Sequence, residues 1–273
     1  MSPMSRLALA QVTLCAVDTQ TPALAAQALL RSMQHIQFGR VLLFTHNWLP
    51  AVVLPDIEII DIGPLRSAHE HSAFVMRQLP ACIRTSHVLL TRWDGFVTQP
   101  QAWSDEFLVY DYVAAVWPSV AADMAVGDGG FSLRSRRFLA AGMDVRITET
   151  HPEDEVLCRQ QRRFLEHTHG VIFAPPALAH RFANGDARVP GLLSGKPAPA
   201  LGFRGVHHLP GVLPEAELSR WLDELPASFF IEPDALHLQR ALMAKRMPAA
   251  AARLELRRRS AGGGKGMRPG PGL

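Results

Sequence analysis

The chain of 273 residues has few cysteines, namely Cys15, Cys82 and Cys158. Their number is odd, they lie far apart and they lack the spacing of a zinc site, which indicates buried thiols in a reducing compartment rather than a disulfide framework. Uninterrupted apolar stretches of membrane-spanning length are also absent, and the first apolar run is broken by Gln11 and lacks a clear cleavage site. We therefore expect a cytoplasmic protein without a transmembrane segment.

Most of the chain also lacks an excess of positive charge. From Arg240 onward there are nine Lys or Arg and one acidic residue, whereas the rest carries 19 basic and 24 acidic residues. The net charge of +3 therefore comes from one end, which argues against a nucleic-acid partner. Residues 247–273 are rich in Gly, Pro and Arg, so we expect a disordered tail able to touch anionic surfaces, with a short helix over 249–258 as the alternative.

The body of the chain alternates apolar strands with helical patterns. The expected strands are "QVTLCAVD", "RVLLFT", "IEIIDI" and "SHVLLTRWDGFV". Helices are expected after Thr21, over 68–84, and over 134–141, 152–167, 214–225 and 234–246. This alternation predicts an α/β fold in one domain over 1–246, with a mostly parallel central sheet flanked by helices and a helical C-terminal part. Ligands collect at the carboxyl ends of such strands, where Asp18 and Asp94 lie.

The stretch "TRWDG" places Asp94 and Gly95 directly after the fourth expected strand. A carboxylate in that position can ligate a hard divalent cation that also holds a diphosphate, and glycine lets the backbone approach a ligand. The alternative is an ordinary Asp-Gly turn.

A glycine cluster, "VGDGGFSLRSRRFL", puts Gly127, Gly129 and Gly130 before Phe131 and Ser132. It lacks the Gly-Lys-Ser/Thr ending of a P-loop, and it does not follow the first strand as a dinucleotide fingerprint would. We expect either a loop against which a sugar or acceptor packs, or a structural turn.

Acidic residues open a helix in "THPEDEVLC". Thr150 and Glu153 have the spacing of a capping box, in which case Glu153→Gln should barely change stability. Asp154 can project from the first turn, where the helix dipole favours its anionic form, and can take a proton from an attacking hydroxyl.

Further on, "GFRGVHHLPG" carries Arg204, His207 and His208, which are suited either to metal or phosphate contacts or to a solvated surface.

In this order, the aspartate, the glycine cluster, the acidic pair and the late histidine resemble the landmarks of GT-A type glycosyltransferases. More narrowly, residues 92–118, 126–139 and 151–158 resemble a family of glycosyltransferase-like domains of unknown function, and the resemblance covers roughly residues 10–230. It implies a GT-A-like, Rossmann-like fold.

The resemblance also implies roles for individual residues. Glu153 and Asp154 match the acidic pair that contains the catalytic base. Asp94 and His207 match ligands of Mn²⁺ or Mg²⁺. The residues implied for donor binding are Asp18, Asp94, Gly129, Gly130, Phe131, Ser132 and Arg204. Arg92 replaces the first Asp of Asp-x-Asp, which leaves metal dependence open. Arg204 stands where histidine is expected, so either His207 or His208 takes that role or the phosphate charge is met differently.

The function implied is transfer of a sugar from a nucleoside-diphosphate donor, with a UDP-sugar favoured, to a hydroxyl of a glycan or another acceptor. Asp154 is the expected base. A noncatalytic module that binds nucleotide sugars or carbohydrates is the first alternative. A metal-dependent phosphoesterase is the second, and it predicts a denser cluster of metal ligands.

Overall fold

The computed structural model describes residues 6–117, 121–185 and 199–262. The chain separates into two compact units, residues 1–204 and 205–273, where the sequence predicted one domain over 1–246. The strands of the first unit are β1 (Leu7–Val17), β2 (Ile36–Thr45), β3 (Glu58–Asp61), β4 (His87–Thr91), β5 (Gly95–Val97), β6 (Tyr112–Val116), β7 (Val126–Ser135), β8 (Ala183–Asn184) and β9 (Gly202–Arg204). Its helices are α1 (Pro22–Met33), α2 (Ala68–Arg77), α3 (Leu79–Cys82), α4 (Arg136–Gly142), α5 (Glu153–Glu155), α6 (Arg162–His169) and α7 (Pro176–Phe182), and a π-helical turn (Val156–Gln160) joins α5 to α6.

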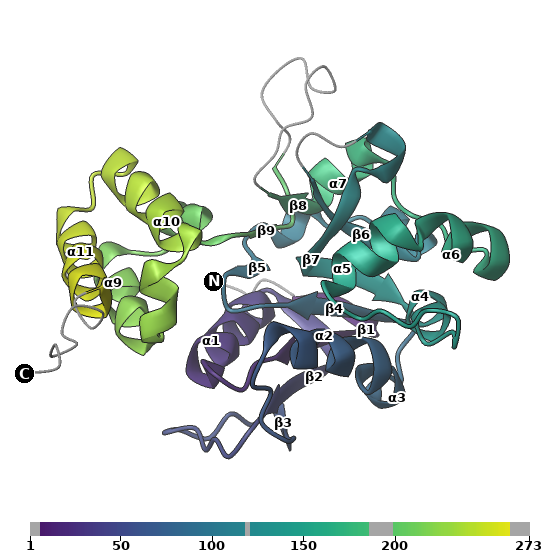
Figure 1. Ribbon diagram of the computed structural model, residues 1–273, viewed down its shortest axis with the longest axis horizontal. Helices are drawn as coiled ribbons and strands as arrows, with labels where there is room; N and C mark the ends of the chain where they lie inside the picture. The colour runs from purple at the N-terminus through teal and green to yellow at the C-terminus, as the bar shows by residue number, and fades with distance from the viewer. Residues whose placement is uncertain (1–5, 118–120, 186–198, 263–273) are drawn as a thin grey trace, which may run out of the picture. The chain divides into compact units, whose positions relative to one another are not determined.

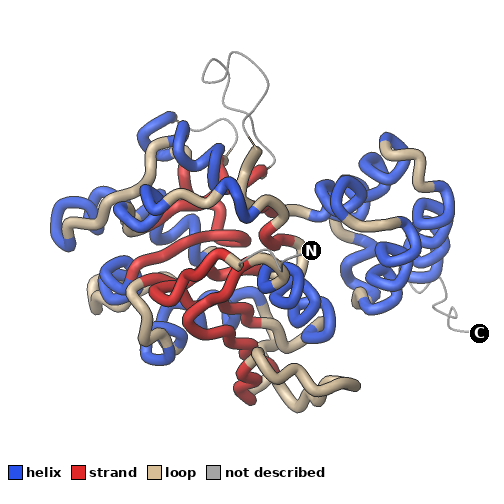
Figure 2. Tube along the Cα trace, turned by 180° about the vertical axis from the view of Figure 1, so that it is seen from behind, coloured by secondary structure: helices blue, strands red, loops and turns tan. Residues whose placement is uncertain are grey.

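A six-stranded sheet in the order β3-β2-β1-β4-β7-β6 forms the centre of this unit (Figures 1 and 2). The pairs β3–β2, β2–β1 and β1–β4 are parallel, whereas β7 is antiparallel to both β4 and β6. A smaller sheet has the order β5-β9-β8. The prediction of a mostly parallel central sheet is confirmed.

Both faces of the large sheet are buried, as the alternation along β1 illustrates. Val12, Leu14 and Ala16 belong to a core cluster that includes residues of α1 and α7. Their neighbours Cys15 and Val17 belong to a cluster that includes residues of α2, α3 and α4. Because successive side chains of a strand point to opposite faces, the sheet is covered by helices on both sides, as predicted.

The glycine cluster differs from its prediction, because it is not a loop. Residues 126–135 form strand β7, in which Leu133 pairs with Leu89 of β4 and with Val113 of β6. The backbone hydrogen bonds of two neighbouring strands therefore fix this segment. The three glycines interrupt any alternation of apolar and polar residues, so the sequence pattern did not indicate a strand.

The second unit is helical. Its elements are the 3₁₀ turns Val206–His208 and Ala227–Ile231 and the helices α8 (Leu209–Val212), α9 (Glu215–Glu224), α10 (Pro233–Ala244) and α11 (Pro248–Gly262). Within the described part of the chain, no helix combines the length and the apolar character needed to cross a membrane.

Helix α11 corrects the prediction of a disordered tail for residues 248–262. It buries Ala250, Ala251 and Leu254, and Arg253 forms a double hydrogen bond with Asp223 of α9 at 2.7 and 2.5 Å. The alternative of a short helix over 249–258 was the correct one, although the helix is longer. Residues 263–273 lie outside the described residues.

We predict that Leu254→Ala destabilises the protein by about 2–5 kcal/mol, because Leu254 is fully buried and the substitution leaves a cavity. The matched control is Leu256→Ala in the same helix, where the leucine is 65% exposed and the change should stay within about 0.5 kcal/mol. Urea unfolding of the full chain followed by circular dichroism measures both. Equal effects of the two substitutions would show that α11 does not pack as described.

Candidate functional site

Polar residues gather where β1 and β4 end. Ala16 of β1 is paired with Thr91 of β4, so Asp18 and the turn after Thr91 lie at the same edge of the sheet. Because β7 is antiparallel to β4, the residues that begin β7 lie beside this edge too, with Phe131 paired with Thr91. The position is the carboxyl edge of the parallel strands, where open α/β sheets bind ligands.

Asp94 lies in a tight turn after β4. The Gly95 N–H donates to the Arg92 carbonyl at 3.2 Å, and the Thr91 hydroxyl donates to the Gly95 carbonyl at 2.5 Å. The side chain of Asp94 is only 2% exposed, its Oδ1 accepts no hydrogen bond, and Arg92 Nε lies 3.5 Å from that oxygen. The predicted Asp-Gly turn is therefore present, and it carries a buried carboxylate. A buried acceptor without a hydrogen bond is uncommon in proteins and requires an explanation.

Gly129 and Gly130 are required by close packing. A Cβ on Gly129 would lie 3.1 Å from Asp154 Cβ, and a Cβ on Gly130 would lie 2.6 Å from Arg204 Cγ. Neither has the positive φ that favours glycine, which among the described glycines belongs to Gly170 and Gly205. The two glycines therefore let side chains from distant parts of the chain lie against β7.

Asp128, between the glycines, is a residue that the sequence analysis missed. Its buried carboxylate accepts the Gly130 N–H at 3.0 Å and lies 3.2 Å from Arg204 Nε. Burial raises the pKa of Asp128, while Arg204 and the Gly130 N–H oppose the rise and the charges of Asp154 and Asp94 add to it. These interactions place three aspartates within electrostatic reach of one another. An acidic residue flanked by glycines was the signal that could have identified Asp128.

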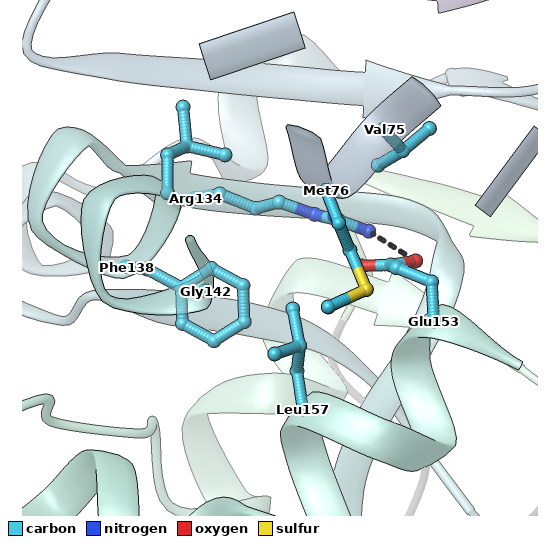
Figure 3. A pocket seen from close by; sticks show the side chains of 8 residues that line it. Val75, Met76, Arg134, Phe138, Gly142, Glu153 and Leu157 are labelled. Atoms are coloured by element: carbon cyan, nitrogen blue, oxygen red, sulfur yellow. Dashed lines mark hydrogen bonds and ion pairs between the residues drawn. The ribbon is translucent and has the colours of Figure 1, made fainter. Parts of the chain in front are cut away.

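The acidic pair of α5 divides into two roles. Glu153 does not close a capping box, since the N-cap residue is Pro152 and no side chain caps the helix. Instead Glu153 Oε1 accepts from Arg134 Nη1 at 2.5 Å, with the Arg134 side chain 1% exposed (Figure 3). Asp154 accepts the Gly129 N–H at 3.1 Å and the Glu155 N–H at 2.9 Å, and it is half-buried.

Burial raises the pKa of the Glu153 carboxyl, and the charge of Arg134 beside it opposes that rise. Burial lowers the pKa of the Arg134 guanidinium, but the Glu153 carboxylate, the hydrogen bond to it and the Tyr112 hydroxyl together raise that pKa above its usual value. Arg134 also donates to the Ser132 hydroxyl at 2.9 Å, and its guanidinium lies 5.5 Å from the centre of the Tyr112 ring. The guanidinium is therefore held on several sides, and Glu153 is committed to it.

A cavity of about 10 Å³ lies next to this ion pair (Figure 3). Of its eight lining residues, Arg134 and Glu153 are the charged ones, and Val75, Met76 and Phe138 are among the apolar ones. This volume holds about one water molecule, so the cavity is not a sugar site. It marks the ion pair as part of the interior.

The other residues predicted for the site lie in different surroundings. Asp18 accepts hydrogen bonds from the N–H groups of Gln20 and Thr21, at 2.8 and 2.6 Å, and from the Thr21 hydroxyl at 2.7 Å. Phe131 is fully buried against Phe182, so its side chain belongs to the core rather than to a surface that a donor touches.

Two further predicted residues are Ser132 in the first unit and His207 in the second. The Ser132 hydroxyl is buried and donates to the Gly129 carbonyl at 3.2 Å. His207 belongs to the second unit, and its ring lies 4.0 Å from that of His208. The described residues of the first unit therefore bring together Asp94, Asp128, Gly129, Gly130, Asp154 and Arg204.

The donor set at this edge does not fit a protein-held divalent cation. Among the described residues, no group of three or more His, Cys, Asp or Glu side chains is arranged to hold a metal. The Asp94 carboxylate instead has a guanidinium beside it. The prediction that Asp94 and His207 ligate Mn²⁺ or Mg²⁺ stays a prediction, because the two residues belong to different units.

Comparison with known proteins adds three findings. Residues 56–189 match the family model "Protein of unknown function (DUF5672)", and this range includes all three motif blocks. No curated protein sequence matches the chain significantly. Among solved structures, the mannosyltransferase PcManGT from Pyrobaculum calidifontis, in complex with GDP-Man and Mn²⁺, is similar with a TM-score of 0.40 and 12% identity, over 95% of this chain and 76% of that one.

We predict that Glu153→Gln destabilises the protein by about 3–5 kcal/mol, because it leaves the buried Arg134 without its counter-charge. The matched control is Glu155→Gln in the same helix, where the carboxylate pairs with Arg159 at 3.0 Å and both side chains are partly exposed. This control should cost at most about 1 kcal/mol. Urea unfolding compares the two, and a Glu153→Gln protein as stable as the control would restore the capping interpretation.

Proposed function

We propose that the protein is a nucleotide-sugar-dependent glycosyltransferase whose acceptor-activating base is Asp154. The observation that supports this most directly is the position of Asp154 at the carboxyl edge of the sheet, hydrogen-bonded to Gly129 and within electrostatic reach of Asp128, which pairs with Arg204. Such an edge offers a base for a hydroxyl and guanidinium groups for phosphates within one small area.

The two acidic residues of α5 suit different tasks in this reaction. Glu153 is buried against Arg134, so its carboxylate neither reaches an acceptor nor is spare for a proton. Asp154 is partly exposed, and the two backbone N–H groups that it accepts fix its orientation. Asp154 is therefore the better general base, and Glu153 acts as a positioning residue.

In the proposed reaction, Asp154 takes the proton of the acceptor hydroxyl as its oxygen attacks the anomeric carbon of the donor. A bond forms between that oxygen and the carbon, the bond from the carbon to the diphosphate oxygen breaks, and the electron pair leaves with the nucleoside diphosphate. A single displacement of this kind inverts the anomeric configuration. The buried Oδ1 of Asp94 is suited to hold the Arg92 guanidinium at the same edge of the sheet.

Neither rival function has equal support. A metal-dependent phosphoesterase needs clustered metal ligands, and the described residues provide no such group. A noncatalytic module on the same fold would need no oriented carboxylate beside Gly129, yet Asp154 is held there by two hydrogen bonds. The preference for a UDP-sugar over other donors remains a prediction that a screen of UDP- and GDP-sugars tests.

We predict that Asp154→Asn lowers turnover by roughly two to four orders of magnitude while donor affinity persists, because the amide keeps the shape but cannot take the proton. The screen first identifies a nucleotide sugar that the purified protein hydrolyses or transfers. Turnover and donor affinity are then measured for Asp154→Asn and for Glu155→Gln, the control at the next position.

Three outcomes separate the alternatives. Loss of turnover in Asp154→Asn alone supports the assignment. Near-normal turnover in that variant would remove Asp154 from the base role. If the wild type binds a nucleotide sugar but neither hydrolyses nor transfers it, the binding module becomes the better description.

A further inference from the structure

We infer that Arg92 and Arg204 form the diphosphate-binding site, and that they neutralise the leaving phosphates in place of a divalent cation. This inference rests on the proposed function and makes it more specific. It is based on where the two guanidinium groups lie and on what holds each of them.

Arg92 is anchored at the end of β4. Its backbone N–H donates to the Gly130 carbonyl of β7 at 3.1 Å, so the residue is fixed to the strand that carries the glycines. Its side chain is 47% exposed, and its Nε lies 3.5 Å from the buried Oδ1 of Asp94. The guanidinium thus meets solvent while one edge faces a carboxylate.

Arg204 reaches the same place from another strand. It ends β9 and pairs with Gly95, which follows Asp94 in the turn after β4. Its side chain lies across Gly130, with Cγ 2.6 Å and Nε 2.7 Å from the point where a Cβ would stand. Nε lies 3.2 Å from Asp128 Oδ1, and the side chain is 26% exposed.

The two arginines are therefore held in the same way. Each uses Nε toward a buried aspartate, Asp94 or Asp128, and each is tied to Gly130, one through its backbone and one through its side chain. The two contacts are ion pairs, in which the charge of the carboxylate attracts the guanidinium, and a guanidinium binds phosphate through its N–H groups. Bonds of this charge-assisted kind are about twice as strong as neutral ones.

The same carboxylates explain why a cation is a poor occupant. An ion at Asp94 Oδ1 would lie beside the positive charge of Arg92, and an ion at Asp128 Oδ1 would lie beside that of Arg204. At short range, two like charges in a partly buried site repel strongly. A diphosphate has the opposite sign and meets both guanidinium groups.

The experiment is isothermal titration of the full chain with UDP and with GDP, once in EDTA and once in Mn²⁺. We expect the same affinity in both conditions for whichever nucleotide binds. Arg92→Gln and Arg204→Gln should each weaken binding on the order of tenfold to a hundredfold, because each removes a charged hydrogen-bond donor. Arg40→Gln is the matched control, since its side chain is 27% exposed and pairs with Glu58 on β3 instead.

A fourth variant reverses the charge at this position. Arg92→Asp places a second carboxylate two residues from Asp94, so binding of the nucleotide should be lost in EDTA and recovered in part with Mn²⁺. Thermal unfolding confirms that each variant is folded.

The outcomes distinguish this inference from the proposed function. Wild-type binding that disappears in EDTA and returns with Mn²⁺ overturns the arginine site but leaves a nucleotide-sugar enzyme. Wild-type affinity in both glutamine variants also overturns it. If neither nucleotide binds under either condition, the proposed function fails together with the inference.

Discussion

The ion pair between Arg134 and Glu153 is the interaction on which the geometry of the site depends. Arg134 lies on β7 and Glu153 opens α5, so the pair fixes that short helix against the central sheet. Burial of two charges is costly unless their hydrogen bonds are satisfied, and here Ser132 and the Gly129 carbonyl complete the set for Arg134. Because Asp154 is the next residue after Glu153, the pair also determines that its carboxylate meets the Gly129 N–H.

Local patterns identified the parallel strands, because β1, β2 and β4 contain continuous buried apolar runs that end at polar residues. The position of Asp94 followed from the same rule and is correct. Strand β7 escaped prediction because three of its first five residues are glycine, and its identity depends on pairing with β4 and β6, which are distant in sequence. Asp128 was missed for the same reason, since a presumed loop gives no direction to its side chain.

The acidic helix start and the last helix show how distant partners override a local signal. Thr150 and Glu153 have the spacing of a capping box, but a buried arginine 19 positions before Glu153 binds its carboxylate instead. Helix α11 consists largely of alanine and arginine, and its apolar face has only a few residues. Arginines of α11 bind groups in other parts of the second unit. Arg257, for example, donates to the Leu225 carbonyl at 2.9 Å. A basic composition alone did not reveal these partners.

The two adjacent glycines of β7 link these observations. Gly129 leaves room for the acidic pair of α5, and Gly130 leaves room for Arg204, which is 74 positions away in the chain. A side chain at either position would displace one half of the candidate site while leaving the strand pairing possible. The side chains of Asp154 and Arg204 thus lie against neighbouring positions of one strand because Gly129 and Gly130 carry no side chains. Since the hydrogen bonds of β4 and β6 hold the backbone of β7, the contacts of Asp154 with Gly129 and of Arg204 with Gly130 both depend on the pairing of this strand.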